Sequence, residues 1–151
     1  MSKLNKGLVL HMPLSQSWSK SATIATDKTP YENDGVIYGA TYTADRHGQP
    51  NSAMSFDGVD DYIDCGNRPS FNFTFGGITI TSWVKRNTIG ASMRILDKGG
   101  QSNSNYDYSM GFGSADKIFF GAVKTSDVIS NRTDSVDKYA STTDWMYIVG
   151  T

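Results

Sequence analysis

Glutamate is almost absent from this chain. Glu32 is the only one among 151 residues, whereas aspartate occurs fourteen times. Because glutamate favours helix interiors and aspartate favours turns, this bias argues against a helical protein. It also excludes the pair of catalytic glutamates on which many glycosidases depend.

The chain also has few cysteines, no long apolar run and no excess of basic residues, and each of these excludes a class of protein. A single cysteine, Cys65, excludes an intramolecular disulfide and is expected to be a small buried residue of a strand. No apolar run approaches the roughly 20 residues of a membrane-spanning helix, and residues 1–14 lack the apolar segment of a signal peptide. The net charge is −1 with scattered lysines and arginines, which offers no basic field to a nucleic acid. We therefore expect no membrane span and no nucleic-acid partner.

Aromatic and turn-forming residues are abundant instead. Aromatic residues make up 12% of the chain, and fifteen glycines accompany them, a composition that suits short strands joined by polar turns. Alternation is clearest over residues 77–86, where Ile80 and Val84 share one face and Trp83 lies on the other. We expect about nine strands and no helix. They are residues 7–14, 36–38, 53–56, 62–65, 77–86, 93–97, 106–112, 117–123 and 145–151, with a long loop at 15–33 and a polar, acidic segment at 127–143.

Residues 52–66 are the most informative stretch. They predict a strand, a tight turn at Asp57-Gly58 and a returning strand, because Gly58 adopts a positive φ without steric cost. Four aspartates lie on and around this turn: Asp57, Asp60, Asp61 and Asp64. Two interpretations stay open, since these carboxylates either solvate a turn or gather a cation and orient the neighbouring strands.

Five segments of the chain together point to a family. They are GLVLHMPL at 7–14, NDG at 33–35 with ATY at 40–42, HG at 47–48 followed by AMSFDG at 53–58 and DYI at 61–63, ITITSWV at 78–84, and WMYIVGT at 145–151. In this order they resemble the laminin G-like domains of the concanavalin A-like lectin/glucanase class. The resemblance implies an all-β jelly-roll sandwich of two antiparallel sheets, one of them concave, with residues 1–151 forming a single laminin G-like domain.

The resemblance also implies that the jelly roll is incomplete at its C-terminus. In the family, several more strands follow the segment that resembles residues 145–151, so the chain corresponds to roughly the N-terminal two-thirds of a domain. We expect a fragment of a longer protein rather than a domain whose missing C-terminal strands come from a partner. An open jelly roll would expose a sheet edge to strand addition.

Two groups of oxygen ligands suit Ca²⁺, which binds six to eight of them in flexible geometry. The first group is Asp57, Asp60 and Asp61, with Asp34 and Asn33 from the preceding turn; the second is Asn103, Asn105 and Asp107. The resemblance implies that the second group lies where related pentraxin-like domains have such a site. Ca²⁺ is thus the candidate cofactor, and the alternative, which we favour, is that these residues only solvate the turns.

Aromatic residues near polar loops predict a sugar-binding surface. Lectin sites combine a ring, which packs on the C–H face of the sugar, with amides and carboxylates that bind its hydroxyls. The candidate platforms are Trp83, Tyr106, Tyr108, Phe112 and Tyr147, and the candidate polar partners are Asn103, Asn105 and Asp107. The alternative is that these rings fill the core. We expect a core position for Trp83 and leave Tyr106 and Tyr108 open.

The predicted function is a non-catalytic, lectin-like module that binds a glycan or another cell-surface polymer. Catalysis is not expected, because no strand carries alternating acids and His11 and His47 lie far apart without a nucleophile motif. The main alternative is a structural or assembly protein that packs against other particle subunits. A polysaccharide hydrolase or lyase is a minor alternative.

The predicted location is extracellular or virion-associated. The resemblance implies a protein that works outside cells, yet the first expected strand begins almost at Met1 with no signal peptide before it. A virus or phage particle reconciles the two observations, because its proteins leave the cell by lysis. A tail, fibre or capsid-decoration protein would satisfy both the binding and the structural hypotheses.

Overall fold

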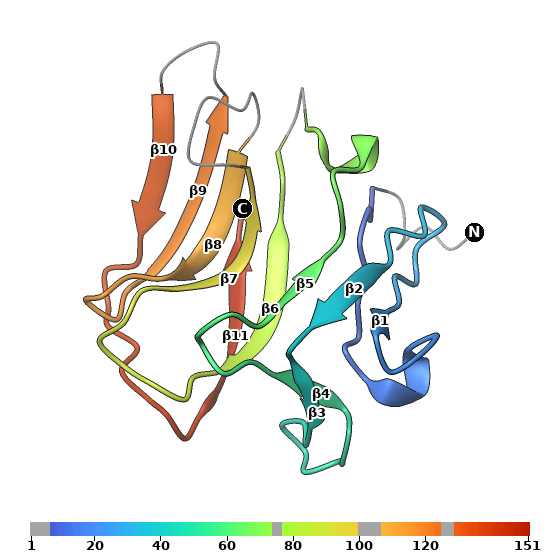
Figure 1. Ribbon diagram of the computed structural model, residues 1–151. Helices are drawn as coiled ribbons and strands as arrows, with labels where there is room; N and C mark the ends of the chain where they lie inside the picture. The colour runs from blue at the N-terminus through green and yellow to red at the C-terminus, as the bar shows by residue number, and fades with distance from the viewer. Residues whose placement is uncertain (1–6, 74–76, 100–106, 125–128) are drawn as a thin grey trace. The chain divides into compact units, whose positions relative to one another are not determined.

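The structure, a computed structural model, describes residues 7–73, 77–99, 107–124 and 129–151 (Figure 1). Within these residues the chain forms eleven short strands and two 3₁₀ turns but no α-helix, which confirms the all-β prediction. None of their helical turns is long and apolar enough to cross a membrane. The chain divides into two compact units, Met1–Asn72 (unit 1) and Phe73–Thr151 (unit 2). The single domain expected over residues 1–151 stays a prediction.

Unit 1 contains five strands in two small antiparallel sheets. The three-stranded sheet has the order β1 (Ile24–Ala25), β2 (Gly35–Tyr38), β5 (Tyr62–Asp64); the two-stranded sheet joins β3 (Thr41–Thr43) to β4 (Ala53–Ser55); the 3₁₀ turns are Gln16–Trp18 and Pro69–Phe71. β1 lies within the segment that we expected to be a long loop. It was missed because a two-residue strand carries no readable alternation.

The strands on either side of the Asp57-Gly58 turn do not pair with each other. β4 pairs with β3, and β5 pairs with β2. The predicted strands are therefore correct, but their pairing as a hairpin is wrong. A tight Asp-Gly hairpin needs a connection of two residues, whereas six residues, 56–61, separate these two strands.

Residues 8–14 form no strand, so the predicted opening strand is wrong. This segment is held by individual hydrogen bonds instead of a ladder. The His11 N–H donates to the Asp27 carboxylate (2.9 Å), and the His11 carbonyl accepts from the Lys28 N–H (2.8 Å). The Asn33 side-chain amide also donates to the Val9 carbonyl (2.8 Å).

Unit 2 contains a four-stranded antiparallel sheet and a separate strand pair. The sheet has the order β10 (Ile129–Asp134), β9 (Ile118–Lys124), β8 (Asp107–Phe112), β7 (Met93–Lys98); the pair is β6 (Ile80–Lys85) with β11 (Trp145–Gly150). β10 lies in the polar segment where no strand was expected. Its sequence, ISNRTD, lacks apolar alternation, but ladder hydrogen bonds need only the backbone.

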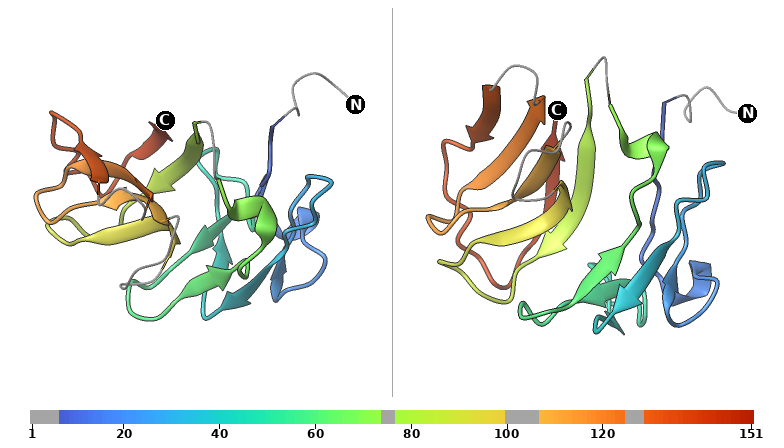
Figure 2. Two further views of the ribbon diagram at one scale, coloured as in Figure 1. Left: turned by 90° about the horizontal axis from the view of Figure 1, so that it is seen from above. Right: turned by 45° about the horizontal axis from the view of Figure 1, so that its top comes forward.

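The core of unit 2 lies between these two layers (Figure 2). Met110 and Phe112 of β8 are fully buried, and they form one cluster with Ile80 of β6 and Ile148 of β11. Phe120 packs so closely against Gly150 that an added Cβ would lie 2.5 Å from its ring. Two β layers around an apolar core agree with the predicted sandwich.

Candidate functional site

The outward face of β6 and β11 carries two exposed aromatic rings. The register places Trp83 directly opposite Tyr147, and their ring centroids lie 5.1 Å apart at an interplanar angle of 38°. Trp83 is 45% exposed and Tyr147 is 55% exposed. The core position expected for Trp83 is therefore wrong. Alternation along β6 turns Ile80 and Val84 inward, so Trp83 must point outward.

The cross-strand residue pairs on either side of Trp83 and Tyr147 extend this outward face, which we call the Trp83 face. Val149 lies opposite Thr81 on one side of the aromatic pair, and Trp145 lies opposite Lys85 on the other. Val149, Thr81 and Lys85 are exposed, and Trp145 is half-buried. The face thus combines apolar surface with a hydroxyl at one end and an ammonium group at the other. Rings of this kind can pack on the C–H face of a sugar while the polar groups bind its hydroxyls.

Tyr108 belongs to the core and not to a ligand surface. It is only 8% exposed, and its ring lies 5.5 Å from that of Phe73. This corrects its assignment as a sugar platform, because alternation along β8 places Tyr108 on the same inward face as Met110 and Phe112. The candidate platform Phe112 is buried for the same reason.

The polar loop predicted beside Tyr108 lies outside the described residues, and so do its candidate ligands Asn103, Asn105 and the neighbouring Tyr106. Asp107 begins β8, but its side chain also lies outside the described part of the chain. The second predicted calcium group therefore stays a prediction, as does the sugar-binding role of these residues.

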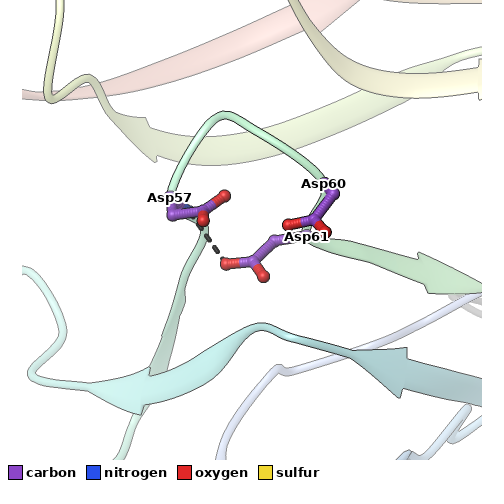
Figure 3. Close-up of side chains that lie close together, drawn as sticks. All are labelled: Asp57, Asp60 and Asp61. Carbon is purple, nitrogen blue, oxygen red and sulfur yellow. Dashed lines mark hydrogen bonds between the residues drawn. The ribbon is translucent and has the colours of Figure 1, made fainter.

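Three of the predicted metal ligands lie together on the connection between β4 and β5 (Figure 3). Carboxylate oxygens of Asp57, Asp60 and Asp61 all lie within 4.8 Å of one another. The Asp57 N–H donates to the Asp61 carboxylate (2.8 Å), and the Val59 N–H donates to the Asp57 carboxylate (2.8 Å). Such bonds also stabilise a simple turn. The geometry is compatible with both interpretations, so calcium here stays a prediction.

Asp34, the fourth predicted ligand of this group, is bonded elsewhere. One of its carboxylate oxygens pairs with the Lys20 ammonium (2.5 Å), and the other accepts from the Asp27 N–H (2.9 Å). Burial alone would raise the pKa of Asp34, but the hydrogen bonds from Lys20 and Asp27 outweigh it and lower that pKa. The structure therefore does not bring Asp34 into the aspartate group.

The sequence analysis missed the most heavily bonded carboxylate of unit 1. Asp27 is buried and accepts four hydrogen bonds: from the Thr29 hydroxyl (2.6 Å), the Thr29 N–H (3.0 Å), the His11 N–H (2.9 Å) and the Asn33 N–H (3.0 Å). Burial raises its pKa, but these bonds together outweigh burial and lower it. The Asp-x-Thr spacing of Asp27 and Thr29 was the readable signal. Asp27 fixes the backbone around it and is not exposed to a ligand.

One known protein family matches this chain over most of its length. The family described as the concanavalin A-like lectin/glucanases superfamily matches residues 57–151, more than half of the sequence. The chain belongs to this superfamily. The resemblance inferred from the sequence is thereby confirmed, and with it the class of fold. Both the Trp83 face and the aspartates at 57–61 lie inside the matched region of this concanavalin A-like chain, whereas Asp27 precedes it.

A solved structure resembles the chain over most of its length. It is the 2.1 Å crystal structure of an S-layer domain-containing protein (residues 221–444) from Clostridium thermocellum ATCC 27405. The TM-score is 0.63 at 19% identity, and the match covers 93% of this chain and 67% of the other. At this identity the likeness supports the concanavalin A-like fold alone. Among curated proteins, none matches the sequence.

Proposed function

We propose that this chain is a non-catalytic, lectin-like domain that binds a glycan or another cell-surface polymer through the Trp83 face. One observation carries the proposal: Trp83 and Tyr147 are paired across β6 and β11 with about half of each ring exposed. Exposed rings next to hydroxyl and ammonium groups are typical of carbohydrate recognition. Membership of a superfamily that is named for lectins and glucanases supports a carbohydrate ligand.

The proposal is one of binding and not of hydrolysis. Two carboxyl groups with different pKa values on either side of the scissile bond are the usual requirement of a glycosidase. Glu32 is the only glutamate of the chain, and the aspartates at 57–61 sit on a largely exposed turn. Release of reducing ends from any bound polysaccharide, measured over time, would contradict this part of the proposal.

Glycan-array binding of three variants tests the surface. Trp83→Ala and Tyr147→Ala are each expected to weaken binding at least about tenfold, because each removes one of the two rings on which the sugar would pack. Val136→Ala is the matched control, since Val136 is exposed in unit 2 but lies outside the Trp83 face. Wild-type binding by both ring variants would refute the assignment of the Trp83 face.

Assembly at a surface is the second candidate function. The similar solved structure comes from an S-layer domain-containing protein, and this favours a cell-surface or extracellular setting as part of our proposal. A virion setting rests on the sequence argument alone. Sedimentation analysis separates the two functions: concentration-dependent assembly together with an empty glycan array would favour the structural role.

Calcium is a separate part of the proposal. If Asp57, Asp60 and Asp61 hold Ca²⁺ in the folded state, added Ca²⁺ should raise the melting temperature and a chelator should lower it. An Asp60→Asn variant should lose that dependence while it keeps the metal-free melting temperature. A wild-type melting temperature that is insensitive to both Ca²⁺ and chelator would remove calcium from the proposal.

A further inference from the structure

A second exposed aromatic pair lies on unit 1, in the sheet formed by β1, β2 and β5. The register places Tyr38 of β2 opposite Tyr62 of β5. Their rings are stacked, with centroids 4.7 Å apart at an angle of 17°. Tyr38 is 45% exposed and Tyr62 is 51% exposed. The alternate residues Ile37 and Ile63 point to the other face of the sheet, so the two rings stand together on the outward face.

The hydroxyl groups of this pair are available to a ligand. Tyr42 lies on β3, the next strand along the chain. Its hydroxyl donates a hydrogen bond to the Ser19 hydroxyl (2.8 Å) and so stabilises unit 1 itself. No comparable bond joins the Tyr38 or Tyr62 hydroxyl to another described residue. A cross-strand aromatic pair contributes about 0.2–1 kcal/mol to a sheet. That modest gain accounts for the pairing, although about half of the surface of each residue stays exposed.

The charge around the pair selects the kind of ligand. Asp64 is exposed on the same face, one row away from Tyr62 and opposite Val36. Asp61 directly precedes Tyr62, and its carboxylate lies against Gly39, which directly follows Tyr38. Neither β2 nor β5 contains a lysine or arginine. Carboxylates accept hydrogen bonds from hydroxyls but repel anions, so this face disfavours a uronate or sulfated sugar.

We propose that Tyr38 and Tyr62 form a second glycan-binding surface, which takes a neutral sugar. The rings would pack on its C–H face, while the phenol hydroxyls and the carboxylate of Asp64 bind its hydroxyls. This inference shares the class of ligand with the proposed function, but it involves different residues in the other unit. The two proposals can therefore fail separately.

Titration calorimetry on the full chain tests the second surface. The probes are neutral hexasaccharides of glucose, mannose, galactose and N-acetylglucosamine, with hexagalacturonate and hexalysine as charged probes. The variants are Tyr38→Thr/Tyr62→Thr and Trp83→Ala/Tyr147→Ala, alone and combined. Threonine keeps a high strand propensity, and Val36→Thr on the same face is the matched control. Circular dichroism of each variant checks that it folds.

Support requires that the tyrosine double variant binds fewer neutral hexasaccharides per chain than the wild type, and that the combined variant binds at least about tenfold more weakly than the Trp83/Tyr147 variant. A wild-type number of bound hexasaccharides in the tyrosine double variant, with wild-type affinity, would overturn the second surface. So would a loss confined to hexalysine, which would indicate a cationic partner, or to hexagalacturonate. If the Trp83/Tyr147 variant alone binds like the wild type, the proposed function loses its site and the second surface stands. If no sugar binds the wild type, both proposals fail.

Discussion

The two units of the chain are stabilised in different ways. Unit 2 encloses an apolar core in which Met110 and Phe112 are fully buried. Among the described residues of unit 1 most buried side chains are polar, and the bonds around Asp27 and Asn33 join segments up to 37 residues apart. The interior of unit 2 therefore depends on volume and close packing, whereas that of unit 1 depends on hydrogen bonds to an ionised group. The two should respond to different perturbations.

Among the described residues of unit 2, Arg86 is a buried charged residue, and it lies against the apolar core. The Arg86 guanidinium pairs with Asp116 (2.8 Å), donates to the Tyr139 carbonyl (3.1 Å) and lies 4.4 Å from the centroid of the Phe112 ring. It thus joins the loops at one end of unit 2 to the core. In unit 1, by contrast, the buried carboxylate of Asp27 is not placed beside an apolar core. It is itself the group around which the neighbouring backbone is arranged, through the four hydrogen bonds that it accepts.

Removing core volume in unit 2 should have the largest effect. Phe112→Ala is expected to lower the free energy of unfolding by about 3–5 kcal/mol, since it leaves a cavity and removes the ring beneath Arg86. Urea unfolding measures the loss, and hydrogen exchange should locate it in β6–β9 and β11. Val136→Ala should change stability by less than about 0.5 kcal/mol. Equal loss of protection in β2 and β5 would show that the two units unfold as one.

Removing the carboxylate in unit 1 should have the next largest effect. Asp27→Asn keeps the size of the side chain but replaces an acceptor oxygen with a donor, so at least one of the four N–H and O–H donors loses its partner. We expect a loss of about 1–3 kcal/mol. The matched control is the exposed Asp60→Asn in the same unit.

The alkylation rate of the Cys65 thiol measures the loss of stability of unit 1 in Asp27→Asn. Burial, reinforced by the nearby carboxylates of Asp64, Asp27 and Asp34, raises its pKa to about 11, so alkylation should be slow near neutral pH while unit 1 is folded. Asp27→Asn should accelerate alkylation, and Phe112→Ala should leave the rate near that of the wild type. Acceleration by Phe112→Ala alone would reverse the comparison of the two units.

Acid should destabilise unit 1 by protonating the Asp27 carboxylate. The folded-state pKa of Asp27 lies below its ordinary value, so ionised Asp27 stabilises the folded state fully above about pH 4, the pKa of an unfolded aspartate. This stabilisation is lost as the pH falls through the lowered folded-state pKa. Hydrogen exchange of β2 and β5 below pH 4 should show this loss in the wild type and a much flatter response in Asp27→Asn. An unchanged acid response in the variant would assign the effect to other groups.

The sequence predicts local structure well where alternation is strong. β6 was predicted from the alternation of Ile80, Ser82 and Val84, but an aromatic residue was equated with the core, although the same alternation points Trp83 outward. The strands β4 and β5 were also predicted, whereas their partners were not, because pairing depends on segments distant in sequence. Asp27 was missed for a related reason: one of its donors, the His11 N–H, lies sixteen residues away.

The two exposed aromatic pairs should give the smallest stability effects, and this makes them useful probes of binding. Trp83→Thr in unit 2 and Tyr38→Thr in unit 1 each remove one ring of a cross-strand pair, for an expected loss of about 0.2–1 kcal/mol. Urea unfolding of both variants checks this value. Since neither ring fills a core, a loss of glycan binding without a loss of stability would reflect the surface itself. A loss above about 2 kcal/mol for either ring would show that it supports the fold, because only burial yields such a value, and that pair would then cease to be a candidate platform.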